Sequence, residues 1–364
     1  MPPTQKELAK LAGVSSGTVS NVISGSANVS DRSRRKVLEA IKALNYQPNL
    51  IARSLKTNRT RTLGFVIPDI TIPFFPKIIR GVECAARERG YFLVVLDSEG
   101  SPEREAEMFA LLHAQRVEGI LLVTAAGDEI TPERWNALTA RFPVVCVDRL
   151  PVGLDVDSVC VDDCGAAEMA ISHLMGQGHT KIAAITGPLT LWNEQERLRG
   201  YRQALQKGGI AIDRSFVWSG SFEQDEVARL CQKGMLRPGG RPTALFSTNG
   251  VTGLAALRSL YVVGLSTPKD FSFVTFDEIN SEDFFRPGIT SVVQPTFDMG
   301  YKAAEVLLDR IGKTEIHGSH KKVRLPATLT VRESSHAPLS IVETKNHSGQ
   351  RGMERKGNHA GGIR

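Results

Sequence analysis

Polar side chains follow four apolar, strand-like runs in the central and C-terminal parts of this sequence. They are Asp69, Asp148, Asn249 and Asp277. In an open parallel sheet, ligands bind in the crevice at the carboxyl ends of the strands. Carboxylate and amide groups bind hydroxyl groups, so these four side chains together predict a site for a polyhydroxylated or otherwise polar small molecule. Any one of them alone is equally well explained as a helix cap, which also commonly follows a strand.

Positive charge is concentrated at the N-terminal end. The first 61 residues hold eleven Lys and Arg against three acidic residues, a net charge of +8. The whole 364-residue chain has a net charge of +6, which leaves −2 for the remainder. Charge gathered at one end indicates a polyanionic partner there, and we expect double-stranded DNA.

Motifs that suggest catalysis occur in the wrong context. Residues 13–17 have the form G-x-S-x-G but follow a helical pattern, whereas a nucleophile elbow follows a strand. Residues 312–314 read Gly-Lys-Thr, but Leu307 stands where a phosphate-binding loop needs glycine. His173 and His179 flank a predicted helix end, where a structural histidine is commoner than a catalytic one. The sequence therefore predicts neither an enzyme nor a cofactor.

The five cysteines are odd in number, lie mostly in apolar runs and lack CxxC spacing, so we predict free thiols in a reducing compartment. Asp162, Asp163, Cys164 and His173 resemble metal ligands, but residues 164–175 have the pattern of an amphipathic helix after a strand, so no metal is predicted. A run of about twenty apolar residues and a secretory signal pattern are both missing. These features predict a cytoplasmic protein that does not enter a membrane.

Three short helices are predicted at the N-terminus. Residues 4–7 have the T-x-x-E form of a capping box, and Leu8, Leu11 and Ala12 give the first helix an apolar face before Gly13 ends it. The tight turn that follows is typical of a helix-turn-helix.

Ser15 is placed to cap the second helix and Ser30 the third. The second helix has Val19, Val22 and Ile23 at helical spacing, and Ser16, Gly17, Ser20 and Asn21 are expected to face outward. The apolar stripe of the third helix is Val37, Leu38, Ile41 and Leu44. Together the three helices predict a small all-α head.

From Thr62 onward, apolar runs alternate with helical patterns, which is the rhythm of a parallel sheet covered by helices. The runs are residues 63–67, 92–96, 120–123, 144–147, 182–185, 244–246 and 271–276. They are too many for one modest sheet, so we predict an α/β body with parallel sheets in two lobes.

Four segments give the chain a strong resemblance to the lactose-repressor (LacI/GalR) family of bacterial transcription regulators. They are residues 11–15 (LAGVS), 18–20 (TVS), 45–49 (NYQPN) and 52–55 (ARSL), and the resemblance extends over about residues 4–335. It implies that the second helix enters the major groove and that hinge helices of two subunits pair in the minor groove. Leu55 matches the leucine that wedges between bases there, which suits an exposed apolar side chain between basic residues.

The resemblance implies a helix-turn-helix head at 1–48, a hinge at 49–61 and a body like a periplasmic sugar-binding protein at 62–336. Lobe 1 would comprise about 62–160 and 292–325, and lobe 2 about 161–291 and 326–336. The strand at 291–293 and the helix after it would return to lobe 1, so that the chain crosses between lobes three times. We expect the basic tail at 337–364 to be disordered.

Site residues follow from the same resemblance, together with the strand-end pattern. The expected DNA-contacting residues are Thr4, Gln5, Ser15, Ser16, Gly17, Thr18, Ser20, Asn21, Asn28, Ser30, Asn49, Ala52, Arg53, Leu55 and Lys56. The expected effector-contacting residues are Asp69, Phe74, Asp148, Trp192, Asn193, Arg197, Phe222, Asn249, Asp277 and Gln294.

Two positions depart from the family pattern. Asn21 stands where many members have arginine, and asparagine favours adenine where arginine favours guanine. Gly250 stands where many members have aspartate, so the site lacks a carboxylate.

These features predict a homodimeric repressor that binds a pseudo-palindromic operator and a sugar or sugar-acid effector, with a purine as the rarer option. One alternative stays open within regulation: a phosphorylated partner protein could act as the corepressor. A sugar-binding module or a sugar-modifying enzyme fits the basic head poorly.

Overall fold

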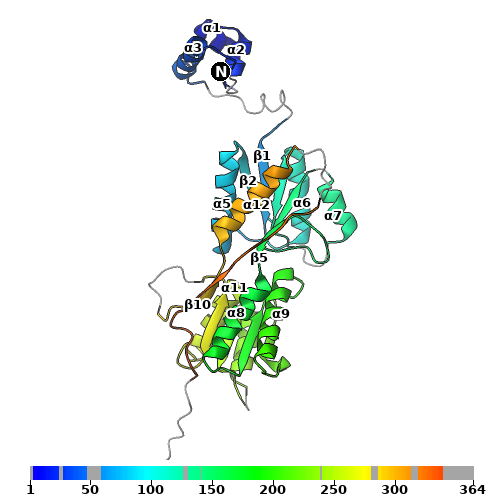
Figure 1. Ribbon diagram of the computed structural model, residues 1–364, viewed down its shortest axis with the longest axis vertical. Helices are drawn as coiled ribbons and strands as arrows, with labels where there is room; N and C mark the ends of the chain where they lie inside the picture. The colour runs from blue at the N-terminus through cyan, green and yellow to red at the C-terminus, as the bar shows by residue number, and fades with distance from the viewer. Residues whose placement is uncertain are drawn as a thin grey trace, which may run out of the picture.

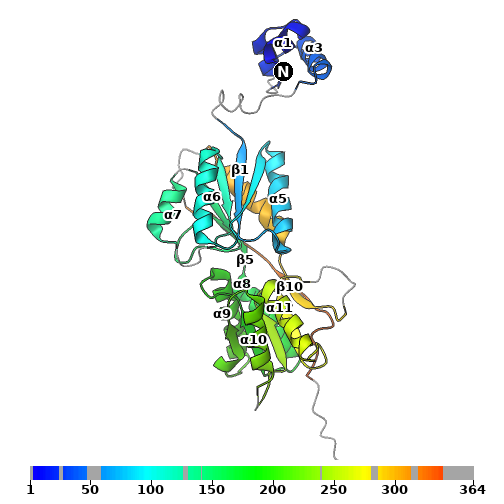
Figure 2. The same cartoon turned by 180° about the vertical axis from the view of Figure 1, so that it is seen from behind.

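The chain forms a small helical head and a two-lobed α/β body, as Figures 1 and 2 show from opposite sides. The computed structural model describes residues 3–23, 28–46, 59–125, 130–140, 142–237, 240–279, 286–312 and 319–338, apart from the side chain of Arg134. This architecture confirms the predicted fold class. The predicted hinge residues Asn49, Ala52, Arg53, Leu55 and Lys56 and all but the first two residues of the predicted tail lie outside the described residues.

The head consists of α1 (Gln5–Ala12), α2 (Ser16–Ile23) and α3 (Asp31–Ala43). The capping box forms as predicted, because Thr4 Oγ1 accepts from the Glu7 N–H at 3.3 Å and Glu7 Oε2 accepts from the Thr4 N–H at 2.7 Å. Gly13 ends α1 with a φ of 62°, in the left-handed region that glycine adopts at low cost. Ser30 caps α3 by accepting from the Ser33 N–H.

Two leucines of the predicted apolar stripes prove to be exposed. Leu11 and Leu38 expose 56% and 53% of their surface, whereas Ala9 and Ala40 are buried in their place. With 3.6 residues per turn, Leu8, Ala9 and Ala12 share one sector of α1 and Leu11 falls beside it. The same geometry places Leu38 beside the α3 stripe, so the head core is smaller than the sequence pattern predicts.

Lobe 1 is built on a fully parallel sheet. Its strand order is β11 (Lys322–Leu325), β5 (Ser158–Val161), β4 (Val144–Val147), β3 (Gly119–Leu122), β1 (Thr62–Ile67) and β2 (Phe92–Asp97). One face packs against α5 (Phe74–Glu88) and α12 (Thr296–Arg310). The other face packs against α6 (Pro102–Ala114) and α7 (Pro132–Thr139).

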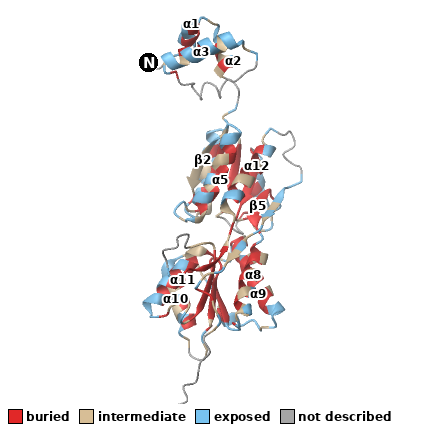
Figure 3. Cartoon of the chain, turned by 60° about the vertical axis from the view of Figure 1, so that its left-hand side comes forward, coloured by how far each residue is buried: buried red, intermediate tan, exposed pale blue. Residues whose placement is uncertain are grey.

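Lobe 2 repeats this layered arrangement. Its strand order is β12 (Thr328–Thr330), β10 (Thr290–Val293), β9 (Ser272–Phe276), β8 (Ala244–Ser247), β6 (Ile182–Thr186) and β7 (Val217–Ser219). Only β12 of these runs antiparallel to its neighbour in the described part of the sheet. The faces are covered by α8 (Asp163–Gly176) and α9 (Trp192–Lys207), and by α10 (Gln224–Met235) and α11 (Gly250–Val262). In Figure 3 the buried residues form the centre of each lobe.

The chain crosses between the lobes three times, after β5, after β10 and after β11. The predicted place of the strand at 291–293 was wrong. It lies in lobe 2, because β10 pairs with β9 through Ser291↔Thr275 and Val292↔Phe276. This pairing completes the buried edge of the second sheet, and only α12 and β11 return to lobe 1.

All five cysteines are free, with Cys84 half-buried and the other four buried. None of the described helices is long and apolar enough to span a membrane.

Candidate functional site

A cavity of about 370 Å³ lies between the carboxyl ends of the two parallel sheets. Lobe 1 contributes the turn after β1 and the start of α5, and lobe 2 contributes the starts of α9 and α11. Nine of the ten predicted effector-contacting residues line it: Asp69, Phe74, Asp148, Asn193, Arg197, Phe222, Asn249, Asp277 and Gln294. The fold therefore brings these residues together, while their contact with an effector stays a prediction.

Trp192, the tenth predicted residue, lies elsewhere. Its ring packs on the lobe 1 cluster that contains Phe109 and Trp135, and the Arg324 guanidinium lies 5.4 Å from the ring centroid. Trp192 is the first residue of α9, and its neighbour Asn193 lines the cavity. Trp192 thus packs lobe 2 against lobe 1 and does not line the cavity, and its contact with an effector stays a prediction.

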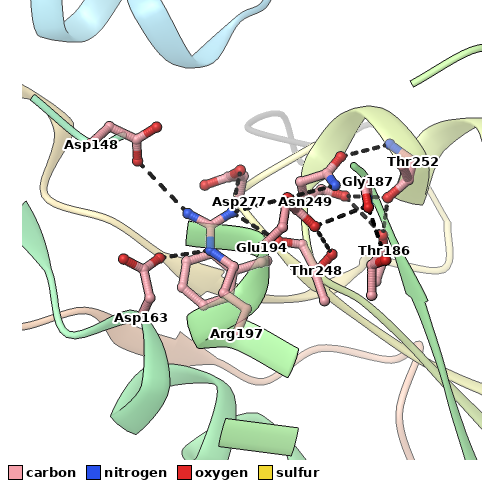
Figure 4. Close-up of polar contacts among 12 residues, drawn as sticks. Asp148, Asp163, Thr186, Gly187, Glu194, Arg197, Thr248, Asn249, Thr252 and Asp277 are labelled. Atoms are coloured by element: carbon pink, nitrogen blue, oxygen red, sulfur yellow. Dashed lines mark hydrogen bonds and ion pairs between the residues drawn. The ribbon is translucent and has the colours of Figure 1, made fainter. Parts of the chain in front are cut away.

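Arg197 is at the centre of the buried polar groups beside the cavity, with only 2% of its surface exposed (Figure 4). Its Nε donates to Asp163 Oδ1 at 2.7 Å, and its Nη1 donates to the Thr248 carbonyl at 2.8 Å. The guanidinium also lies 3.8 Å from the Phe276 ring centroid. Three more carboxylates lie 3.7 to 4.0 Å away, those of Asp148, Asp277 and Glu194.

Glu194 ties the start of α9 to the ends of two strands. It accepts hydrogen bonds from the Gly187 N–H at 2.9 Å, from Asn249 Nδ2 at 3.0 Å and from the Thr248 hydroxyl. Asn249 in turn caps α11, because its Oδ1 accepts from the Thr252 N–H at 2.8 Å. Asn249 is thus a helix cap that also lines the cavity.

Burial sets the protonation of these groups. It raises the pKa of Asp148 to about 6 and that of Asp163 to about 7, although the nearby Arg197 charge opposes both shifts. Burial alone would lower the pKa of Arg197, but the surrounding carboxylates raise it. Arg197 therefore stays charged, while the two aspartates titrate close to neutral pH.

Asp148 and Asp277 both adopt left-handed backbone conformations, with φ of 61° and 67°. Such angles are uncommon for residues other than glycine, although aspartate tolerates them better than most. Each residue follows a strand, β4 in lobe 1 and β9 in lobe 2, and each directs its carboxylate to Arg197. The turn after each strand thus aims one acid from each lobe at the same guanidinium.

Four buried polar atoms on cavity residues have no hydrogen-bond partner within the described part of the chain. They are Asp148 Oδ1, Arg149 Nε, Asn193 Oδ1 and Gln294 Oε1. The Gln294 amide is fixed by its other end, because Nε2 donates to Asp277 Oδ1 at 2.6 Å. A buried polar group without a hydrogen-bond partner costs free energy, so these atoms are candidate contacts for a ligand.

Sequence reasoning missed three residues of this site: Arg149, Asp163 and Glu194. Arg149 and Glu194 are direct neighbours of predicted residues and line the cavity, so proximity to Asp148 and Asn193 was the available signal. Asp163 had been considered only as a metal ligand. No cluster of metal-ligating side chains is found among the residues that the structure describes.

The predicted DNA-contacting residues of the head lie at its surface. Thr4, Gln5, Ser15, Ser16, Gly17, Asn21, Asn28 and Ser30 are exposed, and Thr18 and Ser20 are half-buried. Ser15 Oγ accepts from the Thr18 N–H at 3.1 Å and is 2.9 Å from Thr18 Oγ1, so these two hydroxyls stabilise the start of α2. The rest of the exposed α2 face presents small polar groups.

Known proteins match the chain along most of its length. Residues 4–49 match the family described as bacterial regulatory proteins, lacI family, and residues 171–335 match a periplasmic binding protein-like domain. The ribose operon repressor of Escherichia coli K12 is 34% identical over 332 residues, which are 91% of this chain and 99% of that protein. The chain belongs to the lacI family of bacterial regulatory proteins.

This lacI-family regulator also resembles the HTH-type transcriptional repressor PurR of Aliivibrio salmonicida, with 32% identity over 92% of the chain and 99% of PurR. The crystal structure of the lac repressor dimer bound to operator and the anti-inducer ONPF aligns with a TM-score of 0.80 and 25% identity, over 93% of this chain and all of that one. A complex of the transcriptional regulator CelR with cellobiose aligns with a TM-score of 0.66 and 33% identity, over 92% of this chain and all of that one. The lacI-family chain is therefore a DNA-binding transcriptional regulator.

Proposed function

We propose that this regulator is controlled by a neutral, polyhydroxylated molecule, a sugar or polyol, bound in the cavity between the lobes. The observation that carries the proposal is the set of buried polar atoms on cavity residues that have no hydrogen-bond partner within the described part of the chain. Three of the four are acceptors, namely Asp148 Oδ1, Asn193 Oδ1 and Gln294 Oε1. Acceptors need a ligand that donates, and hydroxyl groups donate, whereas an ionised carboxylate accepts only.

The charge around Arg197 disfavours an anionic ligand beside it. The Arg197 guanidinium already has four carboxylates within 4.0 Å. Arg149, a second cation of the cavity, has an Nε–H without a partner in the described part of the chain, and a hydroxyl oxygen can accept from it. A bound sugar acid or sugar phosphate would add negative charge beside these carboxylates in a poorly solvated place. We therefore narrow the earlier expectation of a sugar or a sugar acid to the neutral class.

The cavity walls suit a sugar ring. Phe74 contributes from lobe 1 and Phe222 from lobe 2, and the Arg149 guanidinium lies 5.6 Å from the Phe222 ring centroid. Aromatic surface packs against the CH groups of a sugar while polar groups bind its edge. The structural relative CelR is described with cellobiose, a neutral sugar, which supports the same class here.

A thermal-shift screen tests this proposal. We expect neutral sugars or polyols to raise the midpoint of unfolding, with a stabilisation of about 2.7 kcal/mol at 100 times the Kd. The shift should disappear in Asn193→Ala but persist in Gln206→Ala, which removes an exposed amide from the same helix. Selective stabilisation by sugar acids, sugar phosphates or nucleobases would refute the neutral class. A folded protein that no compound stabilises would instead favour a partner protein as corepressor.

We further propose that the regulator acts in the cytoplasm as a homodimer, with each head placing α2 in the major groove of one half of a pseudo-palindromic operator. The exposed polar face of α2 supports this arrangement, and the related lac repressor is described as a dimer bound to operator. Two heads on one dimer would meet half-sites about one helical turn apart.

Asn21→Ala is expected to weaken binding to an operator duplex selected from random DNA by the wild-type protein. An asparagine that pairs with adenine contributes about 1–3 kcal/mol of discrimination, which is roughly a 5- to 150-fold change in Kd. Binding to a scrambled duplex should not change, because the amide carries no charge for phosphate binding. Equal losses on both duplexes would show that Asn21 supports the head and does not read a base.

A further inference from the structure

The chain enters lobe 1 from the head side through residues 59–61, which directly precede β1 (Figure 1). Strand β1 is central, with β2 on one side and β3 on the other. Tyr91 immediately precedes β2, and Glu118 immediately precedes β3. The entering segment is therefore flanked by the starts of both neighbouring strands.

Glu118 holds this segment through four hydrogen bonds. Its Oε2 accepts from Arg59 Nη2 at 2.7 Å, from Arg59 Nε at 3.1 Å and from the Tyr91 hydroxyl at 2.9 Å. Its Oε1 accepts from the Arg61 N–H at 2.7 Å. The Glu118 side chain is only 13% exposed, so the carboxylate is largely removed from water.

The backbone bends where Glu118 binds it. Arg61 has a φ of 50°, in the left-handed region that a long side chain rarely occupies. Its N–H is bound by Glu118, and its carbonyl accepts from the Phe92 N–H at 2.8 Å. Such a conformation persists only where several surrounding contacts hold it in place. Here hydrogen bonds to residues at the starts of the neighbouring strands hold both the N–H and the carbonyl of Arg61.

We propose that Glu118 is a positioning residue that fixes the direction in which the chain leaves lobe 1 toward the DNA-binding head. The opposite end of β1 leads to Asp69 in the cavity, so one strand joins the Glu118 contacts to the cavity wall. If the residues that connect the head to lobe 1 could rotate freely, the chain would lose more conformational entropy when both heads bind the two half-sites of an operator. Fixing the exit from lobe 1 lowers that cost.

The charges of the cluster support this role. Burial raises the pKa of Glu118, but the hydrogen bonds from Arg59 and the Arg61 N–H outweigh it and lower the pKa overall. The hydrogen bond and charge of Glu118 raise the pKa of Arg59. Both groups therefore remain charged, and the contacts persist over the physiological pH range.

The test compares Glu118→Ala with Glu107→Ala, which removes an exposed carboxylate from α6 in the same lobe. We expect Glu118→Ala to weaken binding to the selected operator duplex by about tenfold relative to Glu107→Ala. Binding to a scrambled duplex at low salt should be equal in the two variants, because each loses one negative charge. Glu118→Gln, which keeps an acceptor for the Arg61 N–H, should retain more operator affinity than Glu118→Ala.

The scrambled duplex separates positioning from folding. If Glu118 only supports the fold, Glu118→Ala should lower the affinity for the operator duplex and for the scrambled duplex together. If Glu118 has no effect, both affinities should equal those of Glu107→Ala. Either result would overturn the proposal. If Glu118→Ala fails to fold, the same two affinities are measured for Glu118→Gln. A selective loss of operator binding in that variant supports the proposal, and unchanged operator binding refutes it.

Discussion

Arg197→Ala is expected to lower the free energy of unfolding by about 3–5 kcal/mol at pH 8, as measured by urea denaturation. The substitution removes the guanidinium that compensates the carboxylates of Asp148, Asp163, Glu194 and Asp277. It also leaves a cavity against Phe276 and an unpaired carbonyl at Thr248. Breaking a buried ion pair from one side is costly because the remaining charges stay buried.

The loss should be smaller at pH 5 than at pH 8. In the wild-type protein the pKa values of Asp148 and Asp163 are about 6 and about 7, above the value of about 3.9 in an unfolded chain. A raised carboxyl pKa means that the folded state holds more protons, so this contribution to stability falls as the pH rises through 6 to 7. Without the Arg197 charge both pKa values rise further. The penalty in the variant therefore grows with pH, while at pH 5 both carboxyls are mostly protonated in either protein.

Arg199→Ala is the matched control. Arg199 lies two residues further along α9, is half-exposed and pairs with Glu196 at the surface, so its removal should cost less than about 1 kcal/mol at either pH. Equal losses in the two variants, or a loss in Arg197→Ala that shrinks as the pH rises, would contradict this account. The expected instability also affects the choice of variant for ligand experiments. Arg197→Ala would change both ligand binding and stability, so Asn193→Ala is the better variant for testing ligand binding in the cavity.

The sequence predicted a cavity residue where the local pattern around that residue, such as its place directly after an apolar strand, marked it as a site residue. Asp148 and Asp277 follow buried strands, and the carboxyl ends of parallel strands converge, so pattern alone placed them together. Asp163 and Glu194 carried no such signal, because each begins or lies within a helix and their importance comes from Arg197, which is distant in sequence from Asp163. Trp192 does not line the predicted cavity for a related reason: the direction of a side chain at a helix start depends on how the helix packs.

The same limit applies to the fold. Predicted strands such as β1, β3 and β6 are mostly apolar because they are buried on both faces. Strand β2 was also predicted from its apolar residues, although it lies at a sheet edge with Phe92 and Val94 exposed. Strand β11 alternates exposed and half-buried residues, and β12 has one exposed and two half-buried residues. Both lie at sheet edges and carry little hydrophobic signal. The assignment of β10 to its sheet required its pairing partner, which no local pattern specifies.

Gly300→Ala is expected to lower the free energy of unfolding by about 3 kcal/mol, the upper end of what overpacking usually costs. A Cβ at Gly300 in α12 would lie 2.0 Å from the Ile78 carbonyl oxygen of α5, and a Cβ at Gly81 in α5 would lie 2.1 Å from the Phe297 carbonyl oxygen of α12. Both contacts are with backbone atoms, so no side-chain rotation relieves them. The two helices would have to separate, and because α5 begins at Phe74, the cavity wall in lobe 1 would shift with them.

Gly176→Ala provides the control for this prediction, since it makes the same substitution in a helix, α8, where a new Cβ meets no atom within 4 Å. Alanine restricts the unfolded chain more than glycine does, so Gly176→Ala should leave stability unchanged or raise it by up to about 1 kcal/mol. Urea denaturation of both variants at one pH separates the close helix contact from the general effect of adding a methyl group. A Gly300→Ala protein as stable as Gly176→Ala would show that α5 and α12 can move apart without loss. In that case the contact between these helices would not fix the lobe 1 wall of the cavity.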